Sequence, residues 1–79
     1  MKTDEEIRND IRDVLIKCRK EKGLTQEEVA VLVEKKPTTI ASWEQGLSLP
    51  NVQTLYRLAE YYHKSLEYMY GDEETEGEL

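Results

Sequence analysis

The chain has 79 residues, of which 38% are hydrophobic and 35% are charged, and its formal net charge is −6. That length allows one small domain, and no apolar run approaches the roughly 20 residues of a membrane-spanning helix. A single cysteine, Cys18, cannot form an internal disulfide, so we expect a cytoplasmic protein. Several acidic residues follow Gly71, which leaves the charge of residues 1–71 nearly balanced.

Helix-capping signals begin close to the start of the chain. Thr3 and Glu6 form a capping-box pattern, in which each side chain satisfies the backbone N–H of the other residue. Apolar residues then recur at spacings of three and four, which predicts a first helix with a buried face of Ile7, Ile11, Val14, Leu15 and Cys18. Gly23 ends this helix after Lys22, because glycine adopts the left-handed conformation at a helix end without penalty.

A second capping box, Thr25 with Glu28, predicts the start of a short second helix. Its expected buried residues are Val29, Ala30, Leu32 and Val33. Pro37 predicts the start of a third helix over about residues 37–45, because proline in the first helical position loses no hydrogen bond. The expected core residues of this helix are Ile40 and Trp43.

Two further helices are predicted after a loop at residues 47–50. Asn51 caps the fourth, whose expected core face is Val52, Leu55, Leu58, Ala59 and Tyr62. Ser65 caps a short fifth helix, in which Leu66, Met69 and Tyr70 are expected to face inward. The tyrosines left off these faces, which suit the interface of a homodimer, are Tyr56, Tyr61 and Tyr68. We therefore predict an all-α, five-helix domain over residues 1–71 and a disordered acidic tail over residues 72–79.

The link between the second and third helices is very short, which is typical of a helix-turn-helix. The small side chain of Ala30 lets the two helices cross closely. The second helix of such a unit enters the DNA major groove, which is about 12 Å wide. We predict the helix-turn-helix at about residues 26–45 and its recognition helix at about residues 37–45. The spacing alone is only moderately specific, because any helical bundle has short turns.

Enzymatic and metal-dependent functions are not favoured by this sequence. The one histidine, His63, and Cys18 lie far apart along the chain, and there is no glycine-rich phosphate loop. We expect no catalytic residues, no bound metal and no cofactor.

Four stretches of sequence carry a family resemblance. They are RKEKGLTQEEVA at residues 19–30, IASWEQG at residues 40–46, Leu49-Pro50, and LYRLA at residues 55–59. Over about residues 11–71, the chain resembles the phage-repressor family of helix-turn-helix proteins, which is the Cro and lambda-repressor-like, XRE-type family. The resemblance implies a five-helix DNA-binding domain, usually dimeric on an inverted repeat, that acts as a transcriptional regulator.

The resemblance also implies roles for three polar residues. Gln26 matches a glutamine that commonly contacts phosphate and braces the recognition helix, and a helix N-terminus itself attracts phosphate. The alternative is that Gln26 is simply solvated. Arg19 and Glu44 match a structural salt bridge that joins the first helix to the end of the third. The alternative for this pair is two ordinary surface charges.

The base-reading positions are expected at the N-terminus and on the outer face of the third helix: Lys36, Pro37, Thr38, Thr39 and Ser42. Lysine donates to guanine or to phosphate, hydroxyl groups can contact either, and methyl groups or a proline ring pack on a thymine methyl. Thr38 and Thr39 could instead satisfy backbone groups at the helix start. Lys35 and Lys36 are expected to bind phosphate, because the loop at residues 47–49 has no basic residue.

Two residues stand where the family usually has glycine. Glu34 occupies the turn between the second and third helices. Either this turn is altered, or Glu34 adopts a left-handed conformation at a cost of about 1 kcal/mol. His63 stands at the end of the fourth helix, where we expect it to cap the helix rather than to bind a metal.

Three functions are compatible with this sequence. The leading hypothesis is a sequence-specific transcriptional regulator, a repressor of phage, prophage or autoregulatory type that binds double-stranded DNA as a homodimer on an inverted-repeat operator. A second is an antitoxin, whose acidic residues 72–79 would bind a small toxic protein partner. A third is a protein-interaction module without DNA binding, which the net charge and the loop without basic residues favour.

Overall fold

The computed structural model describes residues 1–71, and within that range every regular element is a helix. The helices are α1 (Asp4–Glu21), α2 (Gln26–Val33), α3 (Pro37–Glu44), α4 (Val52–Tyr62) and α5 (Leu66–Met69). The all-α, five-helix fold is confirmed. The predicted disordered tail at residues 72–79 lies outside the described residues.

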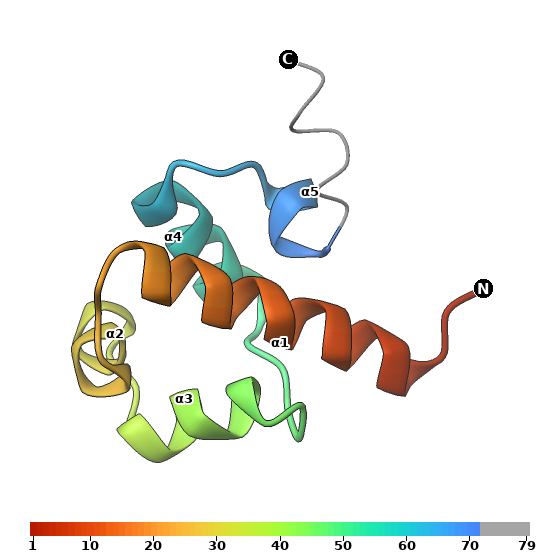
Figure 1. Ribbon diagram of the computed structural model, residues 1–79, viewed down its shortest axis with the longest axis horizontal. Coiled ribbons are helices and arrows are strands. Elements are labelled where there is room, and N and C mark those ends of the chain that lie inside the picture. Colours follow the sequence, from red (N-terminus) through yellow and green to blue (C-terminus); the bar gives the residue numbers. More distant parts are fainter. Residues whose placement is uncertain (72–79) are drawn as a thin grey trace.

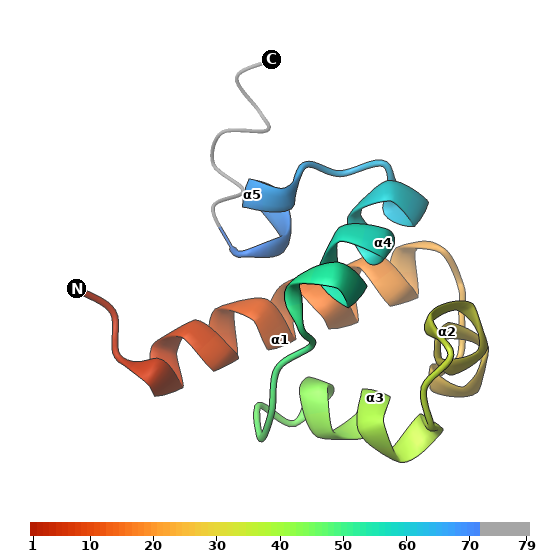
Figure 2. The ribbon, with the colours of Figure 1, turned by 180° about the vertical axis from the view of Figure 1, so that it is seen from behind.

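The long helix α1 runs through the middle of the molecule (Figure 1). The helix α3 lies on one side of α1, and α4 and α5 lie on the other side, as the reverse view in Figure 2 also shows. The helix α2 lies at the C-terminal end of α1, where it packs against both α3 and α4. This arrangement leaves one long side of α3 facing outward. None of the helices within residues 1–71 is both long and apolar enough to cross a membrane.

The helices begin where the capping signals predict. The hydroxyl of Thr3 accepts a hydrogen bond from the Glu6 N–H at 3.1 Å, and the Glu6 carboxylate accepts one from the Thr3 N–H at 2.8 Å. Thr25 and Glu28 make the same pair of hydrogen bonds at the start of α2. Each such cap stabilises its helix by about 1 kcal/mol, so local sequence alone sets these boundaries.

The core forms where the inner faces of the five helices meet. Its buried members are Ile11, Val14, Leu15, Cys18, Val29, Ala30, Val33, Ile40, Trp43, Leu55, Leu58, Ala59, Tyr62, Tyr68 and Met69. Most of them are predicted by the helical periodicity of the sequence. Both predicted core residues of α3, Ile40 and Trp43, are buried.

Four residues predicted to be buried are exposed instead. Ile7, which is 38% exposed, lies in the N-terminal part of α1 before its first buried residue. Val52, which is 65% exposed, occupies the first turn of α4, where the buried polar residue is Thr54. Leu32 and Tyr70 are also exposed, at the edge of α2 and just beyond α5.

Tyr68 is a further correction, because it is 1% exposed rather than available for an interface. With only four residues, α5 turns Tyr68 and Met69 into the core. The Lys17 and Lys64 ammonium groups lie 5.8 and 4.6 Å from the centre of the Tyr68 ring. These cation–π contacts place two lysine side chains against the ring.

The turn between α2 and α3 keeps the shape that a glycine would give it. Glu34 has φ 58° and ψ 45°, and the following Lys35 N–H donates to the Ala30 carbonyl at 2.9 Å, which closes the end of α2. His63 ends α4 in the same way, with φ 59° and ψ 44°. Both residues therefore cap helices in the left-handed conformation, and Glu34 carries the strain rather than altering the turn.

We predict that Glu34→Gly raises the free energy of unfolding by about 1 kcal/mol, because it removes the side chain that disfavours positive φ. In a domain of this size that change corresponds to about 4–8 °C in Tm, which thermal unfolding would measure. The matched control is Glu60→Gly in α4, which has ordinary helical geometry and should lower stability by about 1 kcal/mol. A lower Tm for Glu34→Gly would contradict the assignment of strain to this turn.

Candidate nucleic-acid interface

The C-terminal end of α3 is held by side chains from α1 and α2. The Arg19 guanidinium binds the Glu44 carboxylate in a bidentate manner, with Nε donating to Oε2 at 2.7 Å and Nη2 donating to Oε1 at 3.0 Å. Gln26 Nε2 donates to the same Oε1 at 3.0 Å. Arg19 Nη1 also donates to the Leu24 carbonyl at 2.8 Å, just before α2. One carboxylate therefore joins three helices.

This cluster is largely shielded from water. The side chains of Arg19 and Glu44 are 15% and 7% exposed. Glu44 raises the pKa of Arg19 above its ordinary value, chiefly by accepting its hydrogen bond. Burial, aided by Cys18 and Glu44, raises the pKa of the nearby Tyr62 to about 12. A charged guanidinium therefore lies next to a neutral phenol at neutral pH. Hydrogen bonds to a charged group are roughly twice as strong as neutral ones.

The N-terminal end of α3 is open to solvent. Lys35, Lys36, Pro37 and Thr38 are exposed, and Thr39 is half-buried. Lys36 is the N-cap residue and makes no side-chain capping hydrogen bond. Two ammonium groups thus lie beside a helix N-terminus, whose partial positive charge also attracts phosphate.

Ser42, in the middle of α3, is tied to the loop that follows the helix. Its hydroxyl shares a hydrogen bond with the Ser48 hydroxyl at 2.7 Å, and its carbonyl accepts a hydrogen bond from the Leu47 N–H at 3.0 Å. Ser42 is half-buried rather than fully exposed. A hydroxyl can still take part in a further hydrogen bond, so Ser42 couples the loop to any group that approaches α3.

Sequence reasoning missed the basic residues that α1 brings to this loop. Arg8 Nε donates to the Gly46 carbonyl at 3.2 Å. A Cβ added at Gly46, which has φ +75°, would lie 3.0 Å from Asn9 Oδ1 and 3.7 Å from Arg12 Nη1. The N-terminal half of α1 therefore packs against the end of α3 and places guanidinium groups next to a loop that has no basic residue. The exposed residues at the start of α3 and this arginine pair thus lie towards opposite ends of the helix.

Within residues 1–71, no group of three or more His, Cys, Asp or Glu side chains is placed to hold a metal ion. A family model described as "Helix-turn-helix" matches residues 15–69. The chain belongs to this helix-turn-helix family. The resemblance found in the sequence is thereby confirmed.

A solved structure supports the same assignment. The "Crystal Structure of HTH_3 family Transcriptional Regulator from Vibrio cholerae" superposes with a TM-score of 0.75 and 26% sequence identity. The match covers 89% of this helix-turn-helix chain and 39% of that chain. Arg8 and the whole N-terminal half of α1 lie before the residues matched by the family model.

Three of the curated relatives carry names other than phage repressor. One is a "Putative multi-protein-binding factor 1" from Yarrowia lipolytica, 46% identical over 44 residues, which is 56% of this chain and 29% of that protein. Another is "Multiprotein-bridging factor 1a" from Arabidopsis thaliana, 32% identical over 56 residues, which is 71% of this chain and 39% of that protein. The human "Endothelial differentiation-related factor 1" is 37% identical over 49 residues, covering 62% and 33% of the two chains. This chain spans about a third of the length of these relatives.

We predict that Arg19→Ala or Glu44→Ala lowers the free energy of unfolding by about 3–5 kcal/mol, because each change strands the opposite charge in a buried place. Urea unfolding would measure the loss. The matched control is Arg12→Ala, which removes an arginine from the exposed ion pair with Asp13 and should cost less than about 1 kcal/mol. If Arg19→Ala and Arg12→Ala lowered the free energy of unfolding by similar amounts, the different burial of the two ion pairs would not affect stability, which would contradict this prediction.

Proposed function

We propose that this chain is a sequence-specific DNA-binding transcriptional regulator whose helix α3 enters the major groove. The observation that carries the proposal is the asymmetry of α3. The buried Arg19–Glu44 pair fixes one end of the helix, while Lys36, Pro37 and Thr38 at the other end are exposed. A helix held in this way can present its N-terminal side chains to base edges in one fixed orientation.

We assign phosphate contacts to both ends of α3. Lys35 and Lys36 lie at its N-terminal end, and Arg8 lies beside the loop at its C-terminal end. Gln26 braces Glu44 and lies at the N-terminus of α2, which also favours phosphate. Contacts with phosphate fix the register of the protein on DNA, and base contacts then specify the sequence.

Base contacts fall to Pro37, Thr38, Thr39 and Ser42. Thr38 is exposed at the start of α3, where its hydroxyl and methyl groups can reach base edges. Ser42 is a more constrained reader, because its hydroxyl already shares a hydrogen bond with Ser48. The discrimination supplied by these short side chains is therefore modest for each residue.

The regulator is proposed to bind an inverted repeat as a homodimer, with the two α3 helices about 34 Å apart, one turn of B-DNA. Tyr56 and Tyr70 are 54% and 38% exposed, which is compatible with an interface on α4 and just after α5. Sedimentation with and without DNA tests this part of the proposal. We further propose that the regulator represses a phage, prophage or autoregulated promoter. A fusion of that promoter to a reporter gene tests this repression.

A protein partner in addition to DNA is a second part of the proposal. The names of two relatives, a multi-protein-binding factor and a multiprotein-bridging factor, favour it. Such a partner needs a surface other than the outward side of α3.

The DNA-binding proposal is tested with a duplex selected from a randomised library and with a random duplex. Lys35→Ala should weaken binding to both duplexes equally and lower the slope of log affinity against log salt by about 1, because one phosphate contact is lost. Thr38→Ala should instead change discrimination by about 1–3 kcal/mol at one base pair. Electrophoretic mobility or fluorescence anisotropy over a salt series gives both quantities.

The matched control for charge is Lys64→Ala, since Lys64 lies in the connection between α4 and α5, on the far side of α1 from α3 (Figure 1). This variant should bind both duplexes as the parent does. If Lys35→Ala and Thr38→Ala also match the parent, α3 is not the recognition helix.

A further inference from the structure

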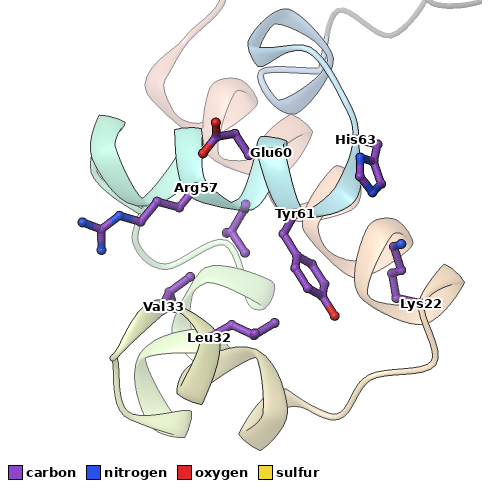
Figure 3. Close-up of a pocket in the computed structure, with 8 residues that line it drawn as sticks. Lys22, Leu32, Val33, Arg57, Glu60, Tyr61 and His63 are labelled. Atoms are coloured by element: carbon purple, nitrogen blue, oxygen red, sulfur yellow. The ribbon is translucent and has the colours of Figure 1, made fainter.

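A groove with a volume of about 580 Å³ lies between α2 and α4, beside the C-terminal end of α1 (Figure 3). Its apolar lining is Leu32, Val33, Leu58 and Tyr61. Leu32 and Tyr61 are 44% and 41% exposed, and the neighbouring Val31 is 78% exposed. Apolar side chains gathered around an open groove offer a surface on which another molecule can bury apolar groups.

The charged side chains of the groove are mostly basic. Lys22 and Arg57 line it together with one acid, Glu60, and His63 lies among the other lining residues. In Figure 3, Glu60 points away from the other lining side chains, whereas Tyr61 extends from α4 towards Leu32. Arg57 extends outward at the edge opposite Lys22, so both cations stand on the rim of the groove.

These cations are available to a partner. The Arg57 guanidinium has no hydrogen-bond or ion-pair partner among residues 1–71. The Lys22 ammonium lies 5.6 Å from the centre of the Tyr61 ring, so it stands over an aromatic wall of the groove. The chain as a whole has a net charge of −6, and a basic rim around an apolar groove in such a chain selects a partner of opposite charge.

We propose that this groove docks an acidic amphipathic helix of a partner protein. The apolar residues of that helix enter between α2 and α4, and its carboxylates pair with Arg57 and Lys22. Helix-in-groove recognition of this kind uses apolar anchors at spacings of three and four residues. The proposal deepens the protein-partner part of the function above and is independent of DNA binding. Among the described residues, α3 contributes none to the groove lining, so both ligands can be bound together.

The test uses a synthetic helical peptide of about 16 residues, with leucines at positions i, i+3, i+4 and i+7 and glutamates elsewhere. A control peptide carries glutamine in place of every glutamate. At low salt, the acidic peptide should bind about tenfold more tightly than the glutamine peptide, because the attraction between exposed charges is then least screened. In spectra of the ¹⁵N-labelled chain, the peptide should shift the amide resonances of α2, of α4 and of Lys22.

Two variants address the groove directly. Arg57→Glu should weaken binding of the acidic peptide about tenfold by turning an attraction into a repulsion. Leu32→Ser should weaken binding of both peptides. The matched control is Lys2→Glu, because Lys2 precedes the far end of α1 and undergoes a similar charge change. It should leave the affinity within about twofold of the parent, as long-range effects on exposed charges are screened. Thermal unfolding verifies that each variant is folded, which the exposure of all three side chains favours.

Equal affinity for the two peptides, no binding of either, or unchanged affinity in both groove variants would overturn the proposal. Resonance shifts confined to another face would overturn docking in the groove, while a protein partner could still bind at that other face. Shifts of α2 and α4 that depend on protein concentration without peptide would assign the groove to a second copy of the chain, which also overturns it. Lys35→Ala, chosen to weaken DNA binding, should bind the peptide as the parent does, so the two proposals fail separately.

Discussion

A buried ion pair between α1 and α3 is the interaction on which the functional geometry of this domain depends. The core holds α3 through only Ile40 and Trp43, and two side chains of a short helix leave its tilt and rotation weakly determined. The Glu44 carboxylate supplies what the core lacks, because it accepts hydrogen bonds from both Arg19 and Gln26. A bidentate pair is sensitive to angle as well as to distance. We therefore regard it as a device for orientation more than for stability.

The remaining contacts of α3 extend this constraint along its length. Ser42 is joined to Ser48, and Arg8 is joined to Gly46, so the loop after α3 is tied to both α3 and α1. The N-terminal end of α3 has no comparable side-chain tether. The helix is thus fixed at the end away from Pro37 and Thr38, the base contacts proposed at its start. The apolar groove between α2 and α4 is formed without α3. One small fold therefore presents two separate surfaces.

The sequence predicts those parts of the fold in which the interacting residues lie close together along the chain. Thr3 with Glu6 is a pattern of four residues. For Glu34, the sequence left an altered turn and a left-handed residue as alternatives, and the structure has the left-handed residue. Burial is less predictable, because it depends on which helices meet in space. Leu32 fits the periodicity of α2 but lies at the edge of the α2–α4 groove, and Tyr68 is buried because α5 is only one turn long.

Two contacts of the candidate site differ in how far the sequence predicts them. The contact between Arg19 and Glu44 is suggested by the family resemblance, whereas no local pattern pairs residues so far apart. The family resemblance does not suggest the contact between Arg8 and Gly46, because Arg8 precedes the region that resembles the family. The length of the first helix was the only signal for it.

The most direct test of this account is the ratio of affinities for the selected and random duplexes in Glu44→Gln. This change keeps the shape of the side chain but removes its charge, and circular dichroism verifies that the helices remain formed. If the ion pair orients α3, the ratio should fall by about tenfold or more, because misplaced base contacts are lost while phosphate contacts persist. A folded variant that keeps the ratio of the parent would contradict the account.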